Sequence, residues 1–130
     1  MHATETEALD WAKHIFTELP VAGLLSARPI RCDPQRGRMT VAFQARREFC
    51  NLIGSVQGGM LTAMLDLVMS FSVLCALDDG HVVPSLEVKT SFIAPARQGE
   101  IILKARWQRV LFIAALVGTL VLVLILSLPR

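Results

Sequence analysis

The chain has 130 residues, of which 53% are hydrophobic and 18% are charged, so it can form one compact core and is not expected to be disordered. Its net charge of +2 arises from mixed acidic and basic residues, which does not indicate a nucleic-acid partner. Three widely spaced cysteines and three scattered histidines favour neither a disulfide framework nor a metal site. The acidic N-terminus is unlike a secretory signal, and we expect a cytoplasmic protein without cofactors.

The first third of the chain predicts one helix and one strand. Apolar residues at helical spacing indicate a helix over residues 5–19, which Pro20 is expected to end. A loop should follow, up to a strand over residues 38–46 in which apolar and polar side chains alternate.

The rest of the chain predicts a long helix followed by further strands. A glycine-rich loop precedes a helix at about residues 57–77, which is apolar nearly all round and should be central and buried. Alternating side chains then indicate strands at 84–96 and 100–110. This order predicts a single α+β domain over residues 1–130, with an antiparallel sheet wrapped around one long helix.

Asp66 is the single charged residue between Leu52 and Leu77. Thr62 and Ser70 lie four residues before and after it, and Gly59 lies seven before, so the helix would carry a narrow polar stripe. A buried carboxylate needs either a partner or a chemical role, because leaving it unpaired is costly. Asp66 is therefore either a structural hydrogen-bonding group or a nucleophile or general base.

The stretch "GSVQGG", residues 54–59, precedes the expected start of this helix. Main-chain N–H groups are free at a helix N-terminus, and glycine lets a ligand approach them closely. Such N–H groups can stabilise the oxyanion that forms when a carbonyl group is attacked. The glycines could equally serve only to begin the helix.

Two motifs together resemble the hotdog-fold acyl-CoA thioesterases of the phenylacetate-pathway and 4-hydroxybenzoyl-CoA type. The first is N-x-x-G-x-V-Q-G-G-x-x-x-x-x-x-D, and the second is "SLEVKTSFIAPARQGE". The resemblance covers about residues 38–109 and implies a hotdog fold that hydrolyses acyl-CoA thioesters. It departs from the common family pattern at Gln57, where histidine is usual, so this position can donate a hydrogen bond but cannot titrate.

The resemblance also implies a division of roles. Asp66 matches the nucleophile or general base, and Gly58 matches the residue whose N–H polarises the thioester carbonyl. Asn51 and Gln57 match residues that position the thioester or the attacking water. Ser85 matches the serine or threonine that helps to hold the water or the acid.

Gly58 and Asp66 are eight residues apart in the sequence, which corresponds to roughly 12 Å along one helix. They cannot both contact the same thioester, so we expect Asp66 of a second subunit to face Gly58 of the first, in a homodimer or a dimer of dimers. No metal is required. Candidate substrate-binding residues are the helix residues Gly59, Thr62 and Ser70, with Arg97 and Arg106 as cations for the phosphates of CoA.

The C-terminal segment 110–128 carries no charge and as a helix is long enough to cross a bilayer. We interpret it as terminal strand structure, because removing it would expose the sheet edge. A membrane anchor and an altered gene end are the alternatives. The corresponding alternative functions are acyl-CoA binding without hydrolysis and a tail-anchored membrane protein.

Overall fold

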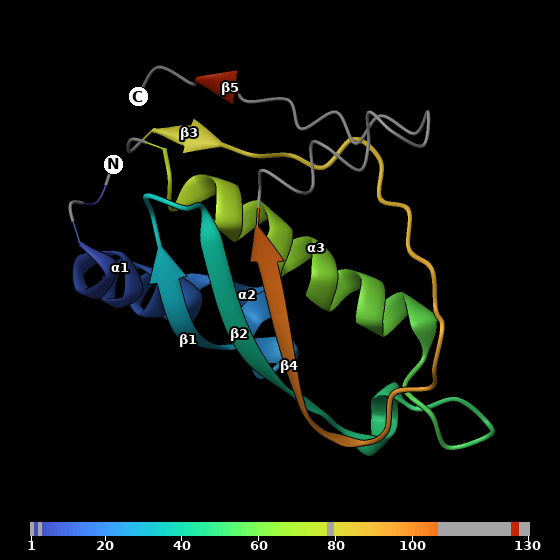
Figure 1. The fold of residues 1–130 in the computed structure, drawn as a ribbon. Helices are drawn as coiled ribbons and strands as arrows, with labels where there is room; N and C mark the ends of the chain where they lie inside the picture. Colours follow the sequence, from blue (N-terminus) through green and yellow to red (C-terminus); the bar gives the residue numbers. More distant parts are fainter. Residues whose placement is uncertain (1, 3, 78–79, 107–125, 128–130) are drawn as a thin grey trace.

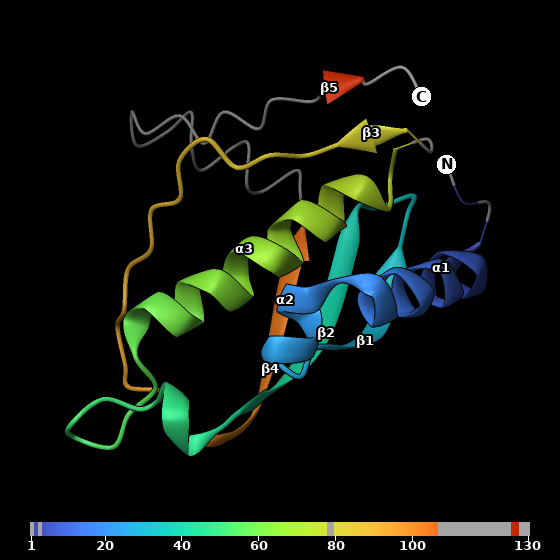
Figure 2. The ribbon, with the colours of Figure 1, turned by 180° about the vertical axis from the view of Figure 1, so that it is seen from behind.

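The computed structural model describes residue 2 and residues 4–77, 80–106 and 126–127 (Figure 1). Three strands, β1 (Arg28–Asp33), β2 (Arg38–Ala45) and β4 (Gly99–Arg106), form an antiparallel sheet in the order β1-β2-β4. Figure 2 shows that the helices all lie on the same face of this sheet. The chain is thus an α+β protein, as predicted, in which the helices cover one face of the three-stranded antiparallel sheet.

The helix α1 (Glu5–Glu18) has nearly the predicted bounds. Thr4 and Glu7 form a capping box, in which each side chain accepts a hydrogen bond from the other residue's main-chain N–H. The prediction of a loop after Pro20 is wrong, because Pro20 begins a second short helix, α2 (Pro20–Leu24). Proline is well tolerated there, since the first N–H groups of a helix have no partner within it.

The strand β2 confirms the predicted alternation, with four apolar side chains fully buried toward the helices: Met39, Val41, Phe43 and Ala45. The edge strand β1 was not predicted. It contains Pro29, next to which the pairing register with β2 shifts, and proline is typical of edge strands and irregular positions. The strand β4 agrees with the predicted strand up to Arg106, and the remaining residues, 107–110, lie outside the described part.

The long helix α3 (Gly58–Leu74) packs against β2 and β4 and ends before the predicted residue 77. Met64, Val68 and Phe71 are buried in the core. The ring of Phe71 meets that of Phe16 from α1 edge to face, with centroids 4.6 Å apart. The expectation that α3 is a central, buried helix is confirmed, since Gly59 is the only exposed residue of the helix and all others are buried or half-buried.

The prediction of a strand over residues 84–96 is also wrong, since no strand is assigned between residues 86 and 96. A strand needs a neighbouring ladder, and this segment instead runs along α3 toward the start of the helix (Figure 1). It follows the two-residue strand β3 (His81–Val82), which pairs with β5 (Leu126–Ser127). Apart from β5, the predicted tail 110–128 lies outside the described residues, and no described helix is long and apolar enough to cross a membrane.

Candidate functional site

A pocket of about 310 Å³ lies at the N-terminal end of α3. Its walls come from the loop that precedes the helix, from the first turn of the helix and from the end of the extended segment before β4. The lining is polar and apolar in nearly equal parts, and it includes the polar side chains of Asn51 and Ser55. The lining residues are Asn51, Ser55, Val56, Gly58, Leu61, Phe92, Ile93, Ala94, Pro95 and Ala96.

Asn51 holds the loop that forms one wall of the pocket. Its Oδ1 atom accepts hydrogen bonds from the main-chain N–H groups of Ile53 and Ser55, at 3.1 Å each. Its Nδ2 atom lies 2.9 Å from the Oγ atom of Ser55, to which it donates. The side chain predicted to position a substrate therefore lines the pocket, and its polar atoms are engaged with the loop itself.

Gly58 is the first residue of α3 and faces the pocket. Gln57 is the N-cap residue, and its carbonyl accepts hydrogen bonds from the N–H groups of Met60 and Leu61. The N–H groups of Gly58 and Gly59 have no acceptor among the described residues. Gly58 thus lines the pocket, and its N–H, at the positive end of the helix dipole, is without an acceptor in the part of the chain that the structure describes. The side chain of Gln57 is exposed and is not part of the pocket lining.

Asp66 lies two turns further along α3, half-buried and outside the pocket. The Oγ atom of Ser85 donates a short hydrogen bond to its Oδ1 atom, so the structure brings these two predicted site residues together. No other hydrogen bond to the Asp66 carboxylate comes from the described residues. Eight residues of α-helix separate Gly58 from Asp66, a rise of roughly 12 Å, so one chain does not join the two halves of the predicted site.

The predicted substrate-binding residues are spread over the chain. Thr62 and Ser70 are half-buried on α3, and the Oγ1 atom of Thr62 bonds that of Thr90 at 3.3 Å. Gly59 is exposed at the start of the same helix. Arg97 is exposed, and its main chain pairs with that of Ser55 in a single antiparallel β-bridge beside the pocket.

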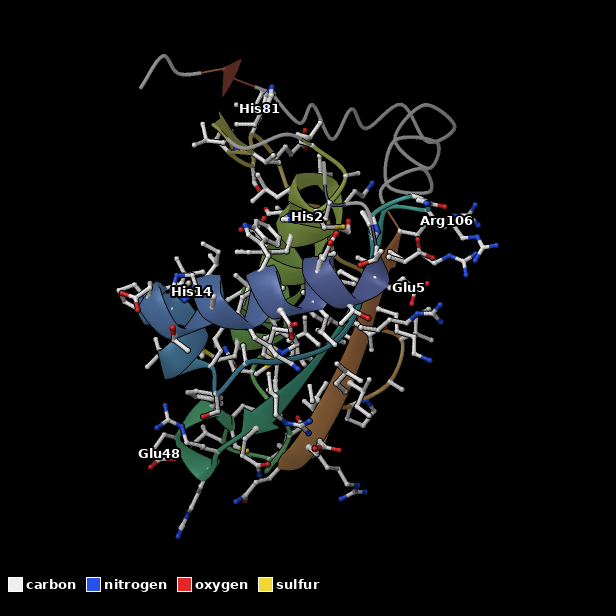
Figure 3. The ribbon with its side chains drawn as sticks, turned by 90° about the vertical axis from the view of Figure 1, so that its left-hand side faces the viewer. His2, Glu5, His14, Glu48, His81 and Arg106 are labelled. Atoms are coloured by element: carbon white, nitrogen blue, oxygen red, sulfur yellow. The ribbon has the colours of Figure 1, made fainter. Side chains whose placement is uncertain are left out.

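Arg106 lies at the opposite end of the molecule from the pocket. It is the last residue of β4, whose other end, at Gly99, is close to Arg97. Figure 3 shows Arg106 far from Glu48, which belongs to the short 3-10 helix Arg47–Phe49 before the pocket loop. Seven residues of strand correspond to roughly 24 Å, so Arg106 does not join the pocket of its own chain.

Residues 92–96 and Leu61 line the pocket but were not among the predicted site residues. The sequence contained a signal for Phe92, which begins the Phe-x-x-Pro end of the second motif. Its contribution depends on the path of residues 86–96 along α3, which alternation alone did not indicate. The side chains of Val56 and Leu61 read in the sequence as ordinary apolar residues.

Two buried cysteines lie away from the pocket. The Cys32 thiol on β1 and the Cys75 thiol at the end of α3 are inaccessible to solvent. The hydrogen bond with Cys75, together with burial, raises the pKa of Cys32 above its ordinary value. Cys50 is half-buried in the approach to the pocket loop. The described residues contain no cluster of three or more metal-ligating side chains.

The sequence profile of the thioesterase superfamily matches residues 53–110 of the chain. Among solved structures, the chain is similar to a phenylacetic acid degradation-related protein from Ralstonia eutropha JMP134. That protein is 36% identical, with a TM-score of 0.67 over 73% of this chain and 74% of the other. No curated protein sequence matches the chain significantly.

Two more distant structures share the fold. The PaaI protein of E. coli, from the phenylacetic acid degradation operon, is 18% identical, with a TM-score of 0.69 over 80% of this chain and 72% of that one. A thioesterase family protein from Silicibacter pomeroyi is 22% identical, with a TM-score of 0.66 over 72% and 67% of the two chains. The hotdog-type fold expected from the sequence is thereby confirmed.

Proposed function

Because the chain belongs to the thioesterase superfamily and therefore has the fold of a thioester hydrolase, we propose that it hydrolyses acyl-CoA thioesters at sites shared by two copies of the chain. Gly58 of one copy and Asp66 of the other would act on the same thioester. The observation that carries this proposal is that Gly58 lines a pocket in which no described residue supplies a carboxylate, while its N–H has no acceptor among the residues that the structure describes.

Gly58 supplies the electrophilic half of the proposed site. A thioester carbonyl oxygen that enters the pocket accepts a hydrogen bond from the Gly58 N–H, at the positive end of the α3 dipole. Negative charge develops on this oxygen when the carbonyl carbon is attacked, so the donor stabilises the transition state more than the ground state.

Asp66 supplies the nucleophilic half from the second copy. The hydrogen bond from Ser85 engages Oδ1, whereas Oδ2 has no hydrogen-bond partner among the described residues and is available for chemistry. Oδ2 either takes a proton from a water molecule that attacks the carbonyl carbon or attacks that carbon itself. In both routes the carbon–sulfur bond breaks, and CoA leaves as a thiolate that is then protonated. When Asp66 itself attacks, the acyl group stays on its carboxylate as a mixed anhydride, which a water molecule then hydrolyses to release the acid and restore Asp66.

The surface beside the pocket favours association of two copies. Leu52, Ile53 and Ile93 are exposed around the pocket, with Leu52 fully so, and an apolar cluster of this kind is typical of an interface. The described residues leave Asp66 only half-buried on its side of α3. A two-fold arrangement would create two equivalent sites, in a homodimer or a dimer of dimers. Arg97, exposed beside the pocket, is a candidate cation for the phosphates of CoA.

The Asp66→Asn variant tests this function because it keeps the shape of the side chain and removes its charge. Hydrolysis of aryl-, short- and medium-chain CoA esters should fall about 10²- to 10⁴-fold, the usual contribution of a general base. The oligomeric state measured by sedimentation should not change. Asp10→Asn is the matched control, since Asp10 is an exposed acid on α1. Unchanged turnover in Asp66→Asn would remove Asp66 from the mechanism.

A further inference from the structure

We propose that Phe92 is a specificity-determining residue, whose ring excludes acyl groups that branch at the carbon next to the thioester carbonyl. This inference rests on the proposed acyl-CoA site and concerns which acyl groups the site accepts. It derives from the position of the ring against the first residue of α3.

The Phe92 ring lies against the main chain of Gly58. A Cβ atom added to Gly58 would be 2.9 Å from Cε2 and 3.0 Å from Cζ of this ring, and its three nearest neighbours are all ring carbons of Phe92. Phe92 is thus the side chain closest to the Gly58 main chain on that side. Gly58 and Phe92 line the same pocket, so a carbonyl oxygen bound to the Gly58 N–H, at about 3 Å, would place its own carbon and the next acyl carbon in the pocket that the ring lines.

The main chain around Phe92 is attached to α3 and its loop on both sides. Thr90, two residues before Phe92, shares a 3.3 Å hydrogen bond with Thr62. Ala96, four residues after it, accepts a 2.8 Å hydrogen bond from the N–H of Val56. These two attachments fix the backbone that carries the ring, although the ring itself is 55% exposed. Phe92 is therefore held beside Gly58 by its backbone and not by burial in the core.

This arrangement distinguishes acyl groups by shape near the carbonyl. A straight chain has only hydrogens on the carbon next to the carbonyl and can pass the ring toward the apolar lining formed by Val56 and Leu61. A branched chain carries an additional methyl group at the position where the ring lies. One methyl group in an apolar pocket typically changes kcat/KM by about 10- to 200-fold, which sets the scale of the discrimination.

The test compares isobutyryl-CoA with butyryl-CoA, which have the same composition and differ only in branching. In Phe92→Ala, the ratio of kcat/KM for the branched to the straight ester should rise at least about tenfold over wild type. Leu86→Ala is the matched control, because Leu86 lies in the same segment, is 54% exposed and does not line the pocket. An unchanged ratio in Phe92→Ala would overturn the inference.

A binding measurement separates this inference from the proposed function. Non-hydrolysable analogues, in which a methylene group replaces the thioester sulfur, keep the carbonyl oxygen that Gly58 would bind. Calorimetry should show that Phe92→Ala improves the affinity for the isobutyryl analogue relative to the butyryl analogue, whether or not the protein turns over either ester. If neither ester is hydrolysed but Phe92→Ala still improves the relative affinity for the isobutyryl analogue, only the hydrolytic function is contradicted. If both esters are hydrolysed but the relative affinity does not change, only the role of Phe92 is contradicted.

Discussion

Replacing Asn51 with alanine should destabilise the protein through the loop that forms one wall of the pocket. The change removes the acceptor for two main-chain N–H groups, those of Ile53 and Ser55, and the donor to the Ser55 hydroxyl. Each hydrogen bond contributes about 0.5–1.5 kcal/mol net. Because Asn51 is half-buried, water can replace part of what is lost, and we expect the free energy of unfolding to fall by about 2 kcal/mol.

Urea denaturation followed by fluorescence measures this loss, with Asn51→Asp as the matched variant. Aspartate keeps an oxygen for the two main-chain N–H groups and loses only the donor to Ser55, so its cost should stay below about 1 kcal/mol. The denaturant slope should be unchanged in both variants if only native contacts are removed. Equal stability of Asn51→Ala and wild type would refute the conclusion that this side chain holds the loop.

Three further outcomes follow from particular contacts. Ellman's reagent should modify Cys50 in the native protein but reach Cys32 and Cys75 only after unfolding, because these two thiols are inaccessible to solvent. Three fast-reacting thiols in native buffer would contradict this prediction. Ser85→Ala should lower kcat by about tenfold, because it removes the hydrogen bond that orients Asp66, and Ser85→Thr should restore kcat. A Ser85→Ala variant with the wild-type kcat would show that the contact has a structural role only. Thr4→Ala should cost about 1 kcal/mol of stability in thermal unfolding by removing the capping box of α1, and an unchanged melting temperature would show that the cap contributes nothing.

The elements that the sequence predicted are those in which the periodic pattern and the tertiary environment agree. The strand β2 alternates and has a neighbour on each edge, and α1 combines an apolar face with a capping box. The elements that it missed depend on context. Pro20 begins the helix α2, although the sequence was interpreted as placing only the end of a helix there. Pro29 lies in the edge strand β1, and the proline and arginine residues of this strand are not typical of a strand.

The segment that contains most of the second motif also depends on its tertiary context. Residues 84–96 alternate as a strand does, yet between residues 86 and 96 the chain runs along α3, because strand formation depends on a neighbouring ladder as well as on pattern. The roles expected for Asn51, Gly58 and Asp66 came from the resemblance of the first motif to a known family, and they stay predictions. The contact between Phe92 and Gly58 could not be predicted, because it arises from the path of a segment that is distant in the sequence.

The central claim, that each site takes Gly58 from one copy and Asp66 from another, calls for two variants that each disable one half. Gly58→Pro removes the N–H from the first helical position, where proline is tolerated. Gln57 already has φ −58° and ψ 134°, which suits a residue before proline. Gly58→Ala is its control, since alanine also adds a Cβ atom beside Phe92 but keeps the N–H. Loss of this donor should cost about 10²- to 10³-fold in kcat.

The most direct test is the activity of purified mixed dimers, isolated through two different tags, that pair a Gly58→Pro chain with an Asp66→Asn chain. In a shared arrangement, one of the two sites receives an intact Gly58 and an intact Asp66, and the other receives both defects. The account predicts that such mixed dimers recover about half of the wild-type kcat per dimer, although each parent homodimer is nearly inactive. Mixed dimers that remain as inactive as their parents would contradict it, because that result is expected if each site is built within one chain.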